Sequence, residues 1–374
     1  MNADEKERGE GGMSENQPRV KMTYEEAVAR IPRRKLPGFW VSTVERVVKE
    51  VGKVRVGKVR EIGASAGGRA LYAVSYGEPD APPKANYNSA VAAREPARYF
   101  DKAGREKPVL MIVGPVHGHE VEGLTGVMNF ISVLETGKDL AGTERAGLGE
   151  LARRCRLVII PVGNPDGVAR FELGALNGME LEDIQFWGQG TWKDDTLCKW
   201  PGCKRLHPKT GEEVGWLGCY FNDDGINPMH DEFFAPMATE APAILKEAQR
   251  WGPDIVTLLH SHSHPPTLLR PEFAPVEAQE EAIRIGLALH EKLTARGLPC
   301  DKPYWEPGPY SKTKNDCLNL GGAIHHTSGA TTFTFECPHG IKGDCTVSME
   351  QILEIQMMLY EVLMESALKR QCQA

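Results

Sequence analysis

Residues 108–120 read PVLMIVGPVHGHE, an apolar run that ends in two histidines and a glutamate. The run has the length and the continuous apolar character of a strand buried on both faces. Residues 119–136 place apolar side chains on one helical face, and Gly137 is a typical residue to end such a helix. This stretch therefore predicts a buried strand, a polar turn and a helix.

The same alternation recurs along the chain. Further buried strands are predicted in RLVIIPV (156–162), DIVTLLH (254–260) and TTFTFE (331–336), and helices at 238–251, 276–296 and 348–369. Apolar strands that alternate with amphipathic helices indicate an α/β fold. We therefore predict a single α/β/α domain with a mixed, mainly parallel central sheet.

Length and composition limit the remaining possibilities. The chain has 374 residues, 41% hydrophobic and 25% charged, and a net charge of -7 without a block of basic residues. These values favour a small or peptidic partner and argue against nucleic acid or a membrane as partner. No signal-peptide core or transmembrane run is present, so a cytoplasmic location is expected, with the nine cysteines as thiols. The oligomeric state is left open.

Two segments depart from the regular pattern. Residues 1–20 are charged and Gly-rich, which predicts a disordered tail before a catalytic domain at 21–374. Residues 171–221 show no sustained period yet hold four tryptophans, and we interpret them as an ordered insertion. The insertion either shapes a substrate pocket or packs against itself. Cys198, Cys203 and Cys219 fall in it and are candidates for a local bridge or a metal clip.

Polar side chains follow three of the predicted strands. His117 and Glu120 follow the first, His260 ends the second and Glu336 ends the third. Ligands of open α/β sheets bind at the carboxyl ends of the strands. Two histidines and a carboxylate are a ligand set found in catalytic zinc sites. His117, Glu120 and His260 are therefore predicted to bind one Zn²⁺, with Glu120 in the first helical turn. Glu336 is then free to act as the general base.

Each residue also has a structural interpretation. A glutamate near the start of a surface helix is common. His262 and His264 alternate with His260, which fits either a second metal site or a solvated edge. Glu336 lies in an apolar strand, where a carboxylate is costly unless it is paired or functional.

In these residues the chain resembles the zinc carboxypeptidases of the carboxypeptidase A type, a family that includes peptide amidases and deacylases. The motifs that carry the resemblance occur in the family's order over about residues 38–365: Ile62-Gly63-Ala64-Ser65 with Gly68-Arg69, His117-x-x-Glu120, Asn164-Pro165-Asp166-Gly167, Pro253-Asp254 with His260-Ser261, and Thr334-Phe335-Glu336-Cys337-Pro338. The resemblance implies the zinc carboxypeptidase-like (phosphorylase/hydrolase-like) fold and the ligand set named above.

The resemblance also implies roles for further residues. Glu336 would activate a water, Arg170 would stabilise the oxyanion, and Arg69 would line the substrate groove. The alternatives are a surface arginine for Arg170 and a turn residue for Arg69.

The chain departs from the family at residues 225–231, GINPMHD. Asn227 stands where the family has an aspartate behind the first histidine, and His230 stands near its carboxylate-binding arginine. We retain both as candidates in the substrate region. The family's tyrosine would have to be Tyr304 or Tyr310.

These observations leave three functions open. The first is a metallocarboxypeptidase-like hydrolase that cleaves a peptide or amide bond. The second is an amidase or deacylase of the same fold that acts on a non-standard substrate. The loss of the family's carboxylate-binding arginine favours this interpretation. The third is a non-catalytic ligand-binding module.

Overall fold

The computed structural model describes residues 20–271, 273–301, 317–343 and 345–372. Residues 1–19 of the predicted tail, Tyr304 and Tyr310 lie outside the described residues. A seven-stranded sheet forms the centre, in the order β1-β2-β4-β3-β7-β9-β8. Its strands are β1 (Lys58–Ala64), β2 (Ala70–Tyr76), β3 (Val109–Val113), β4 (Arg156–Ile160), β7 (Ile255–His262), β8 (Thr267–Leu269) and β9 (Thr331–Pro338).

The four middle strands, β4, β3, β7 and β9, are parallel, and β1, β2 and β8 are antiparallel to their neighbours. The predicted mixed, mainly parallel α/β sheet is therefore confirmed. All five residues of β3 are buried, as expected for a strand covered on both faces. The antiparallel strands lie at the two edges of the sheet, so the parallel strands make up its interior.

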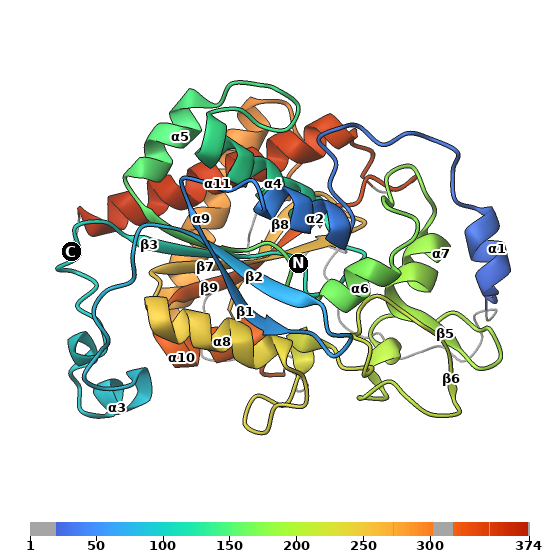
Figure 1. Ribbon diagram of the computed structural model, residues 1–374, viewed down its shortest axis with the longest axis horizontal. Coiled ribbons are helices and arrows are strands. Elements are labelled where there is room, and N and C mark those ends of the chain that lie inside the picture. Colours follow the sequence, from blue (N-terminus) through green and yellow to red (C-terminus); the bar gives the residue numbers. More distant parts are fainter. Residues whose placement is uncertain (1–19, 272, 302–316, 344, 373–374) are drawn as a thin grey trace, which may run out of the picture.

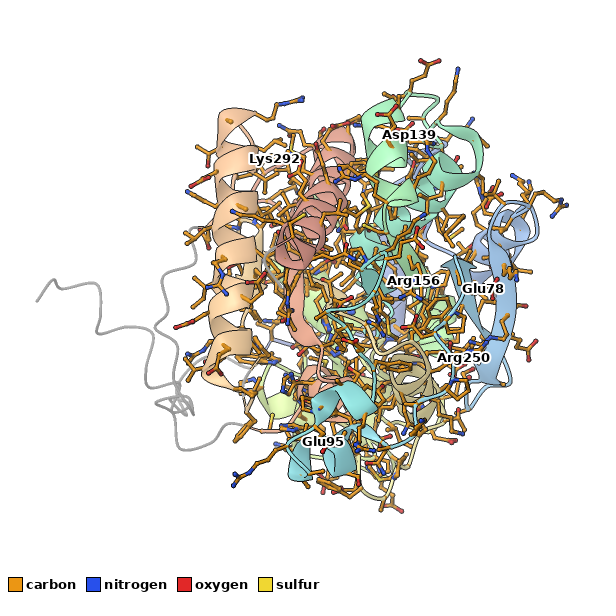
Figure 2. The ribbon with its side chains drawn as sticks, turned by 90° about the vertical axis from the view of Figure 1, so that its left-hand side faces the viewer. Glu78, Glu95, Asp139, Arg156, Arg250 and Lys292 are labelled. Atoms are coloured by element: carbon orange, nitrogen blue, oxygen red, sulfur yellow. The ribbon has the colours of Figure 1, made fainter. Side chains whose placement is uncertain are left out.

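Helices cover both faces of the sheet. The longer helices are α4 (Val121–Thr136), α5 (Ala146–Arg153), α8 (Glu240–Trp251), α9 (Val276–Ala295), α10 (Leu320–Ser328) and α11 (Met349–Gln371). The shorter ones are α1 (Tyr24–Ala29), α2 (Val44–Val51), α3 (Tyr87–Ala92), α6 (Pro165–Arg170) and α7 (Leu181–Ile184). Helices α4, α5, α9 and α11 pack together above the sheet in Figure 1, and α8 and α10 lie below it. The side view agrees, with Lys292 of α9 at the top and Arg250 of α8 low in the picture (Figure 2).

Apolar side chains from both faces form the core. One cluster lies between the sheet and the upper helices, and a second lies between the sheet and α8 with α10. Helix α4 ends at Gly137, whose φ of 79° is left-handed, as the sequence predicted. Gly252 ends α8 in the same way, with φ of 49°.

The insertion at 171–221 is ordered and lies at one end of the sheet. It contains α7, a π-helical turn (Gln185–Gln189) and the two-stranded sheet of β5 (Gly190–Trp192) and β6 (Val214–Leu217). These elements lie to the right of the sheet in Figure 1, beside α1. Trp187 is fully buried, and Trp216 stacks on Phe186 and on Tyr24 of α1. Much of the insertion's aromatic content thus packs against itself and against the N-terminal segment.

None of the nine cysteines, all of which lie among the described residues, forms a disulfide. Cys198, Cys203 and Cys219 are buried in the insertion, and no disulfide joins them. The part of the chain that the structure describes has no helix long and apolar enough to cross a membrane.

Candidate metal centre

Three elements bring the predicted ligands to one end of the sheet. His117 and Glu120 lie in the turn between β3 and α4, and His260 lies near the end of β7. Glu120 is the residue directly before α4 and not, as the sequence predicted, a residue of the first helical turn. In the parallel pairing of β7 with β9, His260 lies opposite Glu336. The strand register therefore places the proposed base beside a proposed ligand.

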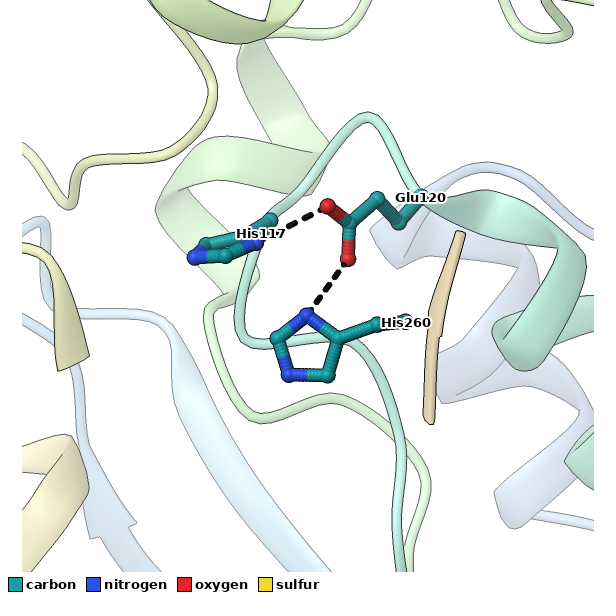
Figure 3. Close-up of side chains that lie close together, drawn as sticks. All are labelled: His117, Glu120 and His260. Atoms are coloured by element: carbon teal, nitrogen blue, oxygen red, sulfur yellow. Dashed lines mark hydrogen bonds and ion pairs between the residues drawn. The ribbon is translucent and has the colours of Figure 1, made fainter. Parts of the chain in front are cut away.

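The side chains of His117, Glu120 and His260 converge (Figure 3). The carboxylate of Glu120 lies between the two rings, 2.8 Å from Nδ1 of His117 and 2.9 Å from Nδ1 of His260. One nitrogen or oxygen from each residue lies within 4.8 Å of the others. The three residues are 5%, 2% and 3% exposed. It is the one such group among the residues that the structure describes.

The chemistry of this group fits a zinc ion. Two imidazole nitrogens and one carboxylate are a catalytic zinc set that leaves a position open. Burial raises the pKa of Glu120 well above the usual value of a glutamate. It lowers the pKa of His117 well below the usual value of a histidine. A buried carboxylate among neutral rings is costly unless a cation neutralises it. A divalent cation bound by these three residues would offset the free-energy cost of burying the Glu120 carboxylate.

Glu336 lies on β9, the strand next to β7. Burial raises the pKa of its carboxyl to about 7, against the opposing effects of His260 and Lys204. A carboxyl with a pKa near neutrality is suited to accept a proton and return it.

Asn227 lies behind His117. Its Oδ1 is 3.3 Å from Nε2 of His117, the ring nitrogen that faces away from Glu120. Oδ1 also accepts a hydrogen bond from the backbone N–H of Met229 at 3.0 Å, which fixes the side chain. Asn227 therefore orients the ring, as expected for the group behind a ligand, but supplies no charge.

Arg69 and Arg170 are both held by carboxylates. Nη1 of Arg69 lies 2.8 Å from Asp166 and 2.8 Å from Asp223, and Arg170 pairs with the same Asp223. Arg170 also donates to the carbonyls of Gly218 and Phe221 at 3.2 and 2.9 Å. These contacts tie the 164–167 turn to the end of the insertion. The catalytic and substrate roles of the two arginines stay predictions.

The histidines beside the triad have other partners. Nε2 of His262 donates to the carbonyl of Pro265 at 2.9 Å, and the His262 ring contacts His264. His119 is 1% exposed and packs against Tyr220 and His339. None of them joins the ligand group formed by the described residues.

Two residues that sequence reasoning missed lie at the site. The ring of Tyr220 packs edge-on against His117, with centroids 3.9 Å apart. Nζ of Lys204 lies 2.8 Å from Nε2 of His230. Both belong to the aperiodic insertion, where no spacing or strand register indicates which side chains turn toward the sheet.

The Asn164-Pro165-Asp166-Gly167 motif supports the ligand turn from behind. Asn164 caps α6, accepting from the N–H of Gly167 at 2.9 Å, and donates to the carbonyl of Val116 at 3.1 Å. Gly118 lies directly against this motif. A Cβ on Gly118 would lie 1.9 Å from the carbonyl carbon of Gly167. The close backbone approach requires a glycine between the two ligands.

We expect Gly118→Ala to weaken metal binding by at least about 10-fold, because displacing the turn disturbs both His117 and Glu120. Calorimetric titration of the metal-free protein with zinc measures the effect. Gly147→Ala is the matched control, since a Cβ there meets no atom within 4 Å. Equal zinc affinity in the two variants would contradict the assigned role of Gly118.

Comparisons with known proteins agree with the fold. Residues 53–200 match the zinc carboxypeptidase family model. The metallo-carboxypeptidase of Burkholderia cenocepacia superposes with a TM-score of 0.52 at 16% identity, over 87% of this chain and 70% of that one. Carboxypeptidase A of Helicoverpa armigera gives a TM-score of 0.52 at 14% identity, over 93% and 78%. No curated protein matches the chain. The resemblance of this chain to the zinc carboxypeptidases is therefore confirmed, by sequence over residues 53–200 and by fold over most of its length.

Proposed function

We propose that this protein is a zinc-dependent hydrolase that cleaves a peptide or amide bond. The convergence of His117, Glu120 and His260 beside Glu336 is the observation that carries this proposal. The four side chains come from three strand ends. The three proposed ligands are buried and Glu336 is half-buried on the neighbouring strand, an arrangement that solvated loop residues do not form. We further propose that residues 21–374 act as one catalytic domain.

Each residue has a distinct part in the reaction. His117, Glu120 and His260 would hold one zinc ion, which polarises the scissile carbonyl and makes water a better nucleophile when bound. Glu336 takes the proton from the attacking water and delivers it to the leaving amine, so one buried carboxyl serves both transfers. Asn227 keeps the His117 ring in place.

The substrate region favours a non-standard substrate over an ordinary peptide C-terminus. His230 contacts Lys204, and burial lowers the pKa of His230 to about 3, so its ring is neutral at pH 7. A neutral imidazole does not give the bidentate, charged contact that an arginine gives a carboxylate. An amidase or deacylase of this fold is therefore the second candidate, with Arg69 and His230 as proposed substrate contacts.

A hydrolysis panel tests the proposal against the binding-module alternative. The full chain is incubated with peptides that have a free or an amidated C-terminus and with N-acyl amino acids, with and without a chelator. We expect zinc-dependent release of an amine from at least one class, restored by added zinc. Zinc bound at one equivalent without hydrolysis of any class would favour a non-catalytic module.

We expect kcat/KM to fall as the pH drops through about 7. Burial raises the pKa of Glu336 to about 7, and only the ionised carboxylate accepts a proton, so the base is lost below that pKa. A pH-rate profile measures this fall of kcat/KM on the acidic side. Zinc content is determined at each pH so that metal loss is separated from protonation. A profile that stays flat from about pH 5 to pH 8 would argue against Glu336 as the base.

A further inference from the structure

Lys204 is the cation that the insertion brings to the candidate centre. It ends a short 3-10 helix (Gly202–Lys204) and is half-buried. Its Nζ donates to Nε2 of His230 at 2.8 Å, so the neutral ring of His230 carries its proton on Nδ1. That nitrogen lies 3.6 Å from Sγ of Cys317. An imidazole, not a carboxylate, therefore holds the ammonium group.

Among the described residues no carboxylate pairs with Lys204, in contrast to the two arginines of the 164–170 segment and the substrate region. Arg69 and Arg170 share the carboxylate of Asp223. Within the described part of the chain, Lys204 forms no ion pair with a carboxylate, and its other close contact is the ring of Trp200, 5.5 Å from Nζ. An unpaired cation at the edge of a buried site acts strongly on charge that develops there.

A chain of contacts links Lys204 to the candidate centre. The backbone N–H of its partner His230 donates to the carbonyl of Asn227 at 3.0 Å, and Oδ1 of Asn227 lies 3.3 Å from Nε2 of His117. The scissile carbonyl must lie between the proposed ligands and Glu336 if the proposed function holds. Lys204 is thus held on the His117 side of the centre, from which its ammonium group can approach the carbonyl oxygen.

We propose that Lys204 stabilises the negative charge that develops on the substrate's carbonyl oxygen, and that His230 is its positioning residue. This inference rests on the proposed hydrolytic function and names the group that does this work in the present chain. It assigns the role to the insertion and not to Arg170, whose guanidinium is already held by Asp223 and two carbonyls.

The test compares Lys204→Met with Arg205→Met on the substrate that the wild-type protein turns over. Arg205 is the matched control because it is the next residue, carries the same charge and is exposed, with its guanidinium stacked on Trp192 at 3.8 Å. Removing one preorganised stabiliser of an oxyanion costs about 10²–10³-fold in kcat. We expect that loss in Lys204→Met, with KM changed less than about 3-fold, and wild-type kinetics in Arg205→Met.

Binding of a phosphonate peptide provides a readout that does not depend on turnover. Its tetrahedral anion resembles the reacting carbonyl, so Lys204→Met should weaken its binding by about the same factor as kcat. Zinc content and Tm should stay at the wild-type values. A higher KM at unchanged kcat would overturn the proposal in favour of a role in gripping a substrate carboxylate. Unchanged kinetics, or a loss confined to Arg170→Met, would overturn it as well.

His230 is tested through a double-mutant cycle. If His230 acts by holding Lys204, His230→Leu lowers kcat in the wild-type background but has little further effect in the Lys204→Met background. Additive losses would show that His230 acts on its own and would overturn its positioning role. A wild-type protein that binds no zinc and cleaves nothing would refute the proposed function itself, an outcome distinct from any of these.

Discussion

Glu336→Gln is expected to lower kcat by roughly 10²–10⁴-fold while the protein keeps its zinc. Glutamine has the same shape as glutamate but cannot accept a proton, so it removes the base without creating a cavity. Because Glu336 is not one of the three converging ligands, metal binding should survive the change. Steady-state kinetics with metal analysis of the same sample measure both quantities.

The control for this variant is Glu291→Gln, an identical change on the exposed face of α9. It should have wild-type activity. If Glu336→Gln also keeps wild-type kcat, another group is the base and the proposed mechanism is wrong. Loss of zinc together with activity would instead make Glu336 a ligand.

His260→Ala is expected to weaken zinc binding by more than about 10²-fold and to abolish hydrolysis. Disturbing a group behind a ligand typically costs 10–100-fold in affinity, and removing a ligand atom itself should cost more. Nδ1 of His260 lies 2.9 Å from the Glu120 carboxylate, so its loss also removes a neighbour of that buried charge. Competition titration with a chromogenic chelator measures the affinity.

Asn227→Ala provides the graded comparison. It removes the contact of 3.3 Å behind His117 but takes away no candidate ligand. Its affinity loss should lie within the 10–100-fold range and below that of His260→Ala. Equal losses in the two variants would indicate that His260 is not a direct ligand.

The sequence was sufficient for the four parallel strands of the sheet and for the position of the candidate centre. The runs that became β3, β4, β7 and β9 are continuously apolar because both faces of each strand are covered, and this pattern is local. Parallel strands end at the same edge, so the residues that follow them had to meet. His117, Glu120 and His260 were predictable for that reason.

Contacts made by the insertion could not be predicted in this way. Lys204 and Tyr220 reach the centre through irregular backbone, where neither a helical nor a strand period links sequence position to side-chain direction. The pairing of Arg170 with Asp223 joins residues 53 positions apart without any shared element. The resemblance suggested an arginine at the oxyanion, and only the three-dimensional contacts show that the guanidinium of Arg170 pairs with Asp223.

Anomalous diffraction from crystals of the zinc-loaded protein, recorded at the zinc absorption edge, tests the central claim most directly. We expect one strong anomalous peak bounded by Nδ1 of His117, the Glu120 carboxylate and Nδ1 of His260. A peak at the buried thiols of Cys198 and Cys203, or no peak at the triad in protein that binds zinc in solution, would contradict it.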